Sequence, residues 1–243
     1  MVDPRMIIIE ERLEETSNII AVSSGKGGVG KSIIASTLAL TLGKKGYKVG
    51  LFDLDFTSPS THVILGVESL KPREEKGLIP PQVHGLKYMS IVYYSGEHAL
   101  PLRGAGVSNA LIELLAVTRW GALDFLIIDM PPGISDATLD IIRLVKRIKF
   151  LVVTTPSQLA FETVRKLASL LRELEIPIIG VIENMKMKDS AFIQQRVEGK
   201  GMDFWGEIPF DNNLEEAIGN VNGLLDTVVA KKLTEAVSEY LNL

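Results

Sequence analysis

Cysteine is absent from the 243 residues of this sequence. Without thiolates, the chain can form no disulfide, and it cannot by itself hold thiolate-ligated zinc or an iron–sulfur cluster. Histidine is also scarce, because only His62, His84 and His98 occur. They lie far apart and lack the i, i+4 spacing of a helical metal site. We therefore expect no nickel site on this chain.

An excess of positive charge and long apolar runs are also missing. The sequence has 26 Lys and Arg against 30 Asp and Glu, so no overall basic field attracts nucleic acid or anionic lipid. No apolar run reaches the roughly 20 residues that cross a bilayer. The first residues, MVDPRMIIIEER, turn acidic after a short apolar stretch, unlike a signal peptide. We expect a cytoplasmic protein with neither nucleic acid nor membrane as a partner.

Short, almost uniformly apolar segments alternate with segments of helical periodicity. The former predict strands at 19–23, 48–52, 125–128, 150–153 and 178–182, and the latter predict helices at 32–45, 107–117, 137–146 and 159–174. Continuous apolarity indicates strands that are buried on both faces. The alternation predicts an α/β fold with a parallel sheet flanked by helices on both faces. We expect one domain over residues 19–243, preceded by an N-terminal arm of residues 1–18.

A glycine-rich segment, GKGGVGKS, lies between the first predicted strand and the first predicted helix. It matches G-x-x-x-x-G-K-[ST], a phosphate-binding loop in which backbone N–H groups and a helix N-terminus face an anion. Lys31 is expected to reach the β- and γ-phosphates of ATP, and Ser32 to ligate Mg²⁺. A plain glycine-rich turn is the alternative. The candidate nucleotide-binding residues here are Gly25, Lys26, Gly27, Gly28, Val29, Gly30, Lys31, Ser32 and Ile33.

Three aspartates follow predicted buried strands. Asp53 and Asp55 lie on the same side of the chain at the carboxyl end of the sheet, where open α/β proteins bind ligands. Such a pair can hold a magnesium-bound water and orient the attacking water, although helix capping is the alternative. Asp129 ends the strand of FLIIDMPPG, as expected for a Walker B acid that holds Mg²⁺ through water, and its alternative is also a helix cap. Gly133 would contact the γ-phosphate through its N–H.

A base-binding site is predicted near the end of the chain. Asn184 follows the strand at 178–182, and its amide can donate to and accept from an adenine edge. Pro209, Phe210 and Asp211 in EIPFD are candidates for backbone contacts to the same base. The alternative for Asn184 is an ordinary turn residue.

The second lysine of the loop, Lys26, carries a family resemblance. KGGVGKS resembles the deviant P-loop of the Mrp/MinD/ParA class of ATPases, which implies that Lys26 crosses a dimer interface to the partner's ATP. A solvated loop lysine is the alternative. DLDFTSPS resembles switch I of the class, which implies that Asp55 positions the attacking water and Asp53 supports the metal, although many members have glycine in place of Ser58. We expect a homodimer that hydrolyses ATP to ADP and phosphate, with Lys26, Lys31 and Asp55 as catalytic residues.

Within the class, several phrases resemble the Mrp branch: Arg103 with Gly104, WGALDFLIIDMPPG, GVIENM and GEIPFDNNLEEA. Members of that branch commonly carry iron–sulfur clusters on a C-x-x-C pair after the ENM phrase, where this chain reads MKMKDS. A cysteine-free protein of this type also resembles the archaeal nickel-insertion ATPases called HypB, which act with a HypA-type metallochaperone.

That second resemblance implies nickel insertion during [NiFe] hydrogenase maturation. Residues 1–17 would then contact the metallochaperone through a helix, or else be disordered. Two alternatives stay open. The chain could be a cysteine-free iron–sulfur assembly factor or scaffold, or, ranked lower, a MinD- or ParA-like ATPase that positions cargo.

Overall fold

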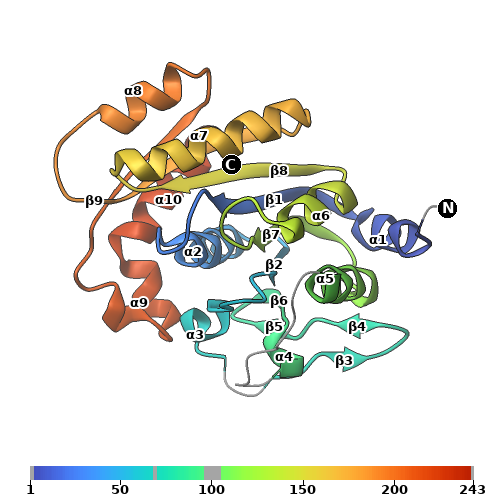
Figure 1. Ribbon diagram of the computed structural model, residues 1–243. Coiled ribbons are helices and arrows are strands. Elements are labelled where there is room, and N and C mark those ends of the chain that lie inside the picture. The colour runs from blue at the N-terminus through green and yellow to red at the C-terminus, as the bar shows by residue number, and fades with distance from the viewer. Residues whose placement is uncertain (1–2, 68–69, 96–104, 242–243) are drawn as a thin grey trace.

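The computed structural model describes residues 3–67, 70–95 and 105–241. Its main sheet has eight strands in the order β10-β9-β8-β1-β7-β2-β6-β5, and all neighbours are parallel except β5 and β6 (Figure 1). The strands are β1 (Thr16–Ser24), β2 (Val49–Asp53), β5 (Gln82–Val83), β6 (Leu86–Ser90), β7 (Leu123–Asp129), β8 (Ile148–Thr154), β9 (Ile178–Lys186) and β10 (Phe204–Pro209). The predicted parallel α/β sheet is confirmed.

Helices cover both faces of this sheet. On one face lie α1 (Arg5–Leu13), α5 (Ala105–Val117), α6 (Asp136–Leu144), α7 (Gln158–Glu173) and α8 (Phe192–Glu198). On the other lie α2 (Lys31–Lys44), α3 (Thr61–Leu65), α9 (Val221–Asp226) and α10 (Val228–Tyr240). A short helix α4 (Val92–Ser95), a 3-10 helix η1 (Glu215–Ala217), and a hairpin of β3 (Arg73–Glu74) and β4 (Leu78–Ile79) complete the described elements.

Two hydrophobic cores follow from the alternation of side chains along the strands. In β1, Ile19 and Ala21 belong to the core under α5 to α8, whereas Ile20 and Val22 belong to the core under α2 and α10. All four are buried, which explains why the strand sequences are continuously apolar. No helix in the described segments is both long and apolar enough to cross a membrane.

The N-terminal arm differs from the prediction. β1 begins at Thr16, so the last residues of the predicted arm belong to the central sheet. The preceding residues form α1, which contacts α5 and α6 and buries Ile9 and Leu13. Residues 5–13 are therefore part of the domain core, and the predicted boundary at residue 18 does not separate two units. Ile7 and Ile8 of α1 stay exposed, and a partner contact there remains a prediction.

Candidate nucleotide-binding site

The glycine-rich segment forms the predicted loop between β1 and α2. Gly30 lies directly before α2 with φ +83°, a left-handed conformation that favours glycine. Gly25 lies so close to α7 that a Cβ would collide with Thr163. The loop therefore needs glycine at both of its ends, at one for conformation and at the other for space.

A cavity of about 540 Å³ opens in front of this loop, within the range of small-molecule sites. From the predicted set, Gly27, Gly28, Gly30, Lys31, Ser32, Ile33 and Asp55 line it. Its other lining residues are Ser24, Ser58, Ser60, Val63, Ile64, Pro132 and Ile218. Ile218 comes from the loop before α9, directly after the phrase GEIPFDNNLEEA, but nothing in that phrase indicated Ile218 as a lining residue.

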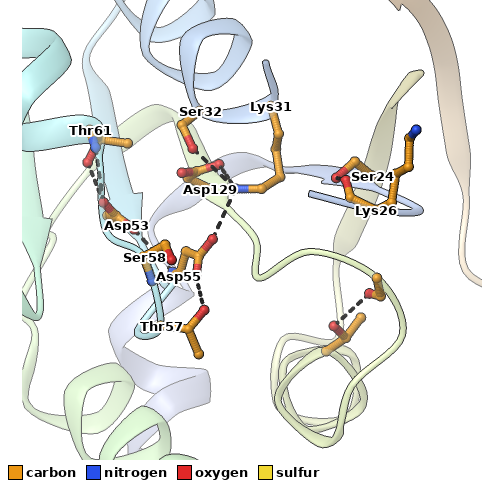
Figure 2. Close-up of polar contacts among 12 residues, drawn as sticks. Ser24, Lys26, Lys31, Ser32, Asp53, Asp55, Thr57, Ser58, Thr61 and Asp129 are labelled. Atoms are coloured by element: carbon orange, nitrogen blue, oxygen red, sulfur yellow. Dashed lines mark hydrogen bonds and ion pairs between the residues drawn. The ribbon is translucent and has the colours of Figure 1, made fainter. Parts of the chain in front are cut away.

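Lys31 is the centre of a buried charge cluster at the base of the cavity (Figure 2). Its Nζ lies 2.5 Å from Oδ1 of Asp129 and 3.8 Å from Oδ2 of Asp55. It also donates to the hydroxyl of Ser32 at 3.3 Å. The order of the sheet explains the meeting, because β1 and β2 both pair with β7, whose last residue is Asp129. The candidate phosphate-binding lysine and the candidate Walker B aspartate therefore form an ion pair, which the sequence did not predict.

Burial changes the proton affinity of the aspartates. Desolvation, followed by repulsion from Asp129, raises the pKa of Asp53 to about 7. Desolvation also raises the pKa of Asp129, against the opposing effect of Lys31. Burial disfavours the charged form of an acid, and a nearby cation stabilises that form. The buried aspartates therefore favour binding of an additional cation.

The residues present fit a magnesium ion. Asp129 uses Oδ1 for Lys31, but its Oδ2 is buried without a hydrogen-bond partner. Ser32 offers a hydroxyl oxygen next to it. Carboxylate, hydroxyl and phosphate oxygens are the ligands that Mg²⁺ prefers, and a buried acceptor without a donor is otherwise costly.

Asp53 and Asp55 separate into different positions. Asp55 lines the cavity, and its Oδ1 accepts bonds from the Thr57 hydroxyl at 2.7 Å and the Ser58 N–H at 3.2 Å. Asp53 is fully buried behind the cavity, where its carboxylate accepts bonds from Asp55 and Thr61. The structure therefore places Asp53 away from the lining, and its predicted role in supporting the metal would need these bonds to change.

Lys26 has an environment opposite to that of Lys31. It is exposed, and Figure 2 shows its ammonium directed away from Lys31 and the aspartates. The Ser24 hydroxyl donates to the Lys26 carbonyl at 2.9 Å, which fixes the loop at this point. Lys26 is thus not part of the charge cluster around Lys31 of the same chain. Its action on a partner's nucleotide stays a prediction.

Gly133 lies next to the phosphate loop, but its N–H is occupied. It donates to the Ser24 carbonyl at 2.9 Å, with Gly133 at φ +74°. This bond joins the loop after β7 to the end of β1. The predicted contact with a γ-phosphate would require the Gly133 N–H to exchange its partner.

The predicted base-binding residues have other partners in this structure. Asn184 is buried, and its amide nitrogen donates to the Val29 carbonyl at 2.9 Å, so it supports the phosphate loop from below. The Phe210 N–H donates to the Lys186 carbonyl at 2.9 Å, and Pro209 ends the edge strand β10.

The side chains of Phe210 and Asp211, which follow β10, do not line the described cavity. The Phe210 ring is 52% exposed, and the Asp211 carboxylate accepts bonds from the N–H groups of Asn213 and Val228. Adenine recognition by these residues stays a prediction. His98, Arg103 and Gly104 lie outside the described residues.

Comparisons with known proteins point to one family. The family model described as ParA, NUBPL iron-transfer P-loop NTPase, matches residues 15–242. An iron–sulfur cluster carrier protein of Pyrococcus abyssi is 34% identical in an alignment of 268 positions. The alignment covers 99% of this chain and 91% of that protein. Carriers of Pseudomonas fragi and Aquifex aeolicus are 42% and 38% identical over 71% and 85% of this chain. The matched region spans only 62% and 61% of their length.

Solved structures agree. A nucleotide-binding protein of Archaeoglobus fulgidus in complex with ADP has a TM-score of 0.78 and 30% identity, covering 91% of this chain and 93% of that one. The septum site-determining protein MinD of Pyrococcus horikoshii, complexed with Mg-ADP, has a TM-score of 0.68 and 24% identity, covering 92% and 95%. The MinD likeness shows a shared fold.

Proposed function

The chain belongs to the ParA family of P-loop NTPases, in the group described as NUBPL iron-transfer NTPases, and from this premise we propose a Mg²⁺-dependent ATPase of iron–sulfur cluster assembly. One observation carries the ATPase part. Beneath a phosphate loop, a buried lysine is paired with an aspartate that keeps one carboxylate oxygen without a partner. When phosphate and metal bind, the lysine of this pair can move to the phosphate and the aspartate can bind the metal.

The residues divide the chemistry among themselves. The loop N–H groups and α2 bind the phosphates, while Lys31 moves its ammonium from Asp129 to the β- and γ-phosphates. Ser32 and the free oxygen of Asp129 would hold Mg²⁺, which neutralises charge that develops on the phosphates. Asp55, at the cavity wall, would accept a hydrogen bond from the attacking water and align it.

The iron–sulfur part rests on the relatives, which are named as cluster carriers. This sequence contains no cysteine, so we propose that the cluster is a substrate whose thiolate ligands come from partner proteins. The expected likeness to nickel-insertion ATPases and a HypA-type partner is not supported, because the matched relatives are iron–sulfur proteins. The cysteine-free assembly factor, the alternative from the sequence, is the better reading.

A two-part experiment tests this proposal. Phosphate release is measured with Mg-ATP, and cluster transfer from a loaded carrier to an apo-acceptor is followed by absorbance, with and without the chain. We expect Mg²⁺-dependent hydrolysis and ATP-dependent acceleration of transfer. Hydrolysis without any effect on transfer would remove the iron–sulfur role and leave the ATPase.

We also propose that Lys26 acts in a partner's site within a homodimer. Lys26→Ala is expected to lower hydrolysis on the order of a thousandfold, as loss of a charge-stabilising finger does. Lys44→Ala, at the exposed end of α2, is the matched control and should keep wild-type activity.

Mixing chains separates action on a partner from action within one chain. An equal mixture of Lys26→Ala and Lys31→Ala chains forms heterodimers in which one site combines an intact Lys31 with the partner's Lys26. Such a mixture should recover roughly a quarter of wild-type activity if subunits exchange freely. A mixture as inactive as either variant alone, in samples shown to exchange subunits, would exclude this role.

A further inference from the structure

A buried hydrogen-bond chain lies behind the cavity wall. Oδ2 of Asp53 accepts bonds from the Thr61 hydroxyl at 2.6 Å and the Thr61 N–H at 3.3 Å. The Thr61 oxygen lies 2.8 Å from the Tyr88 hydroxyl. Because the Thr61 proton is directed at the carboxylate, Tyr88 is the donor in this second bond. All three side chains are buried, so water does not compete for these bonds.

These residues belong to three separate elements. Asp53 ends β2, Thr61 begins α3, and Tyr88 lies in β6, which pairs with β2. Oδ1 of the same carboxylate accepts from the Asp55 N–H at 3.1 Å. One side chain thus binds both ends of the segment 54–60, with one oxygen for each end.

The segment 54–60 contains groups that face the cavity. Asp55 stands 3.8 Å from Lys31, and Ser58 and Ser60 line the cavity wall. At its far end α3 is held separately, because the Gly219 N–H donates to the Ile64 carbonyl at 3.1 Å. The helix is therefore fixed at both ends, and the position of Asp55 depends on the carboxylate that closes the segment.

We infer that Asp53, Thr61 and Tyr88 form a positioning unit, here called the switch clamp, which holds Asp55 at the phosphate end of the cavity. This inference rests on the proposed ATPase function, but the clamp itself is a property of the fold. Asp53 does not line the cavity, and both of its oxygens are engaged by the chain. Thr61 and Tyr88 act only through Asp53 and touch neither lysine.

Thr61→Val removes the hydroxyl and keeps the side-chain shape. We expect the amides of segment 54–60 to exchange hydrogen at least about tenfold faster, which corresponds to loss of one buried hydrogen bond to the Asp53 carboxyl group. The amides of the phosphate loop should be unchanged. For hydrolysis, kcat should fall by a similar factor while KM for ATP stays within about twofold, because the loop that binds ATP is untouched.

Three further variants make the test specific. Thr61→Ser restores the hydroxyl and should recover loop protection and kcat. Tyr88→Phe removes the phenol hydroxyl and with it the bond to Thr61, while the Thr61 bond to Asp53 is kept. It should give a smaller effect in the same direction, and it provides the test if Thr61→Val does not fold. Thr234→Val, which loses a helix-internal hydroxyl bond on α10, should change neither readout.

The possible failures are distinguishable. If Thr61→Val keeps both kcat and the protection of segment 54–60 within about twofold of wild type, the switch clamp is refuted. It is also refuted if Thr61→Ser loses as much as Thr61→Val. If the wild-type chain hydrolyses no ATP, the proposed function fails, whereas hydrogen exchange still decides whether the clamp exists.

Discussion

Replacing Lys31 with Met should destabilise the nucleotide-free protein in a pH-dependent way. Met keeps an unbranched side chain of similar volume but removes the ammonium. The side chain of Lys31 is 7% exposed and that of Asp129 is fully buried, so water cannot replace the lost partner. Removal of one member of a buried ion pair typically costs about 3–5 kcal/mol of the free energy of unfolding.

The pKa of Asp129 determines the sign of the pH dependence. Burial already raises this pKa above the ordinary 3.8, and Lys31 is the main influence that lowers it. Without Lys31 the pKa rises further, so the native state of the variant keeps the proton to higher pH while the unfolded chain ionises near 4. Stability of the variant relative to wild type therefore falls as pH rises. The deficit should be small near pH 5 and should approach the full value at pH 8.

Urea unfolding of wild type and Lys31→Met at pH 5, 7 and 8, without nucleotide, measures this difference. The double variant Lys31→Met/Asp129→Asn is the control, because it removes the uncompensated acid. It should recover at least about half of the loss at pH 8 and show no widening deficit. A single variant within about 0.5 kcal/mol of wild type at pH 8 would refute the reasoning. So would a double variant as unstable as the single one.

Three further predictions concern the same region. Because the pKa of Asp53 is raised from 3.8 to about 7, its neutral form stabilises the fold at low pH, and stability should fall by up to about 4 kcal/mol between pH 4 and 7. Urea titrations should show this slope in wild type and a flatter one in Asp53→Asn. Gly30→Ala meets Asn184 and a positive φ, so it should cost about 1–3 kcal/mol in thermal unfolding. Gly27→Ala, which meets open space, should cost less than about 1 kcal/mol. Ser135→Ala removes the N-cap of α6 and should cost about 1 kcal/mol by the same measurement.

The central strands could be predicted because the burial of each strand is visible in its own sequence. β1, β2, β7 and β8 are buried on both faces, so their sequences are continuously apolar. β10 was missed because it lies at the sheet edge, where Gly206 and Glu207 interrupt the pattern. The short helix α3 was missed because five residues cannot display a helical period.

The site divides in the same way. Lys31 and Ser32 line the cavity, as the motif predicts for a phosphate loop, because glycine conformation and loop geometry are encoded within eight consecutive residues. Asn184 and Asp53 were assigned to ligands, whereas the structure engages them with Val29 and Thr61. An amide or a carboxylate at a strand end has the same sequence signature for either partner, and only tertiary packing decides which one it meets.

The two lysines of the loop together support the proposed homodimer in a way that neither does alone. Lys31 is the one basic side chain among the described residues that line the cavity, and its charge is already matched by buried aspartates. Phosphoryl transfer needs further positive charge around the transferred group. Lys26, five residues away, is exposed and turned outward by the glycine-rich curl of the same loop. In a symmetric dimer that brings the two loops together, each Lys26 would add the charge that the facing cavity lacks. The outward direction of Lys26 in a single chain agrees with the proposed shared site, and the mixing experiment tests this arrangement directly.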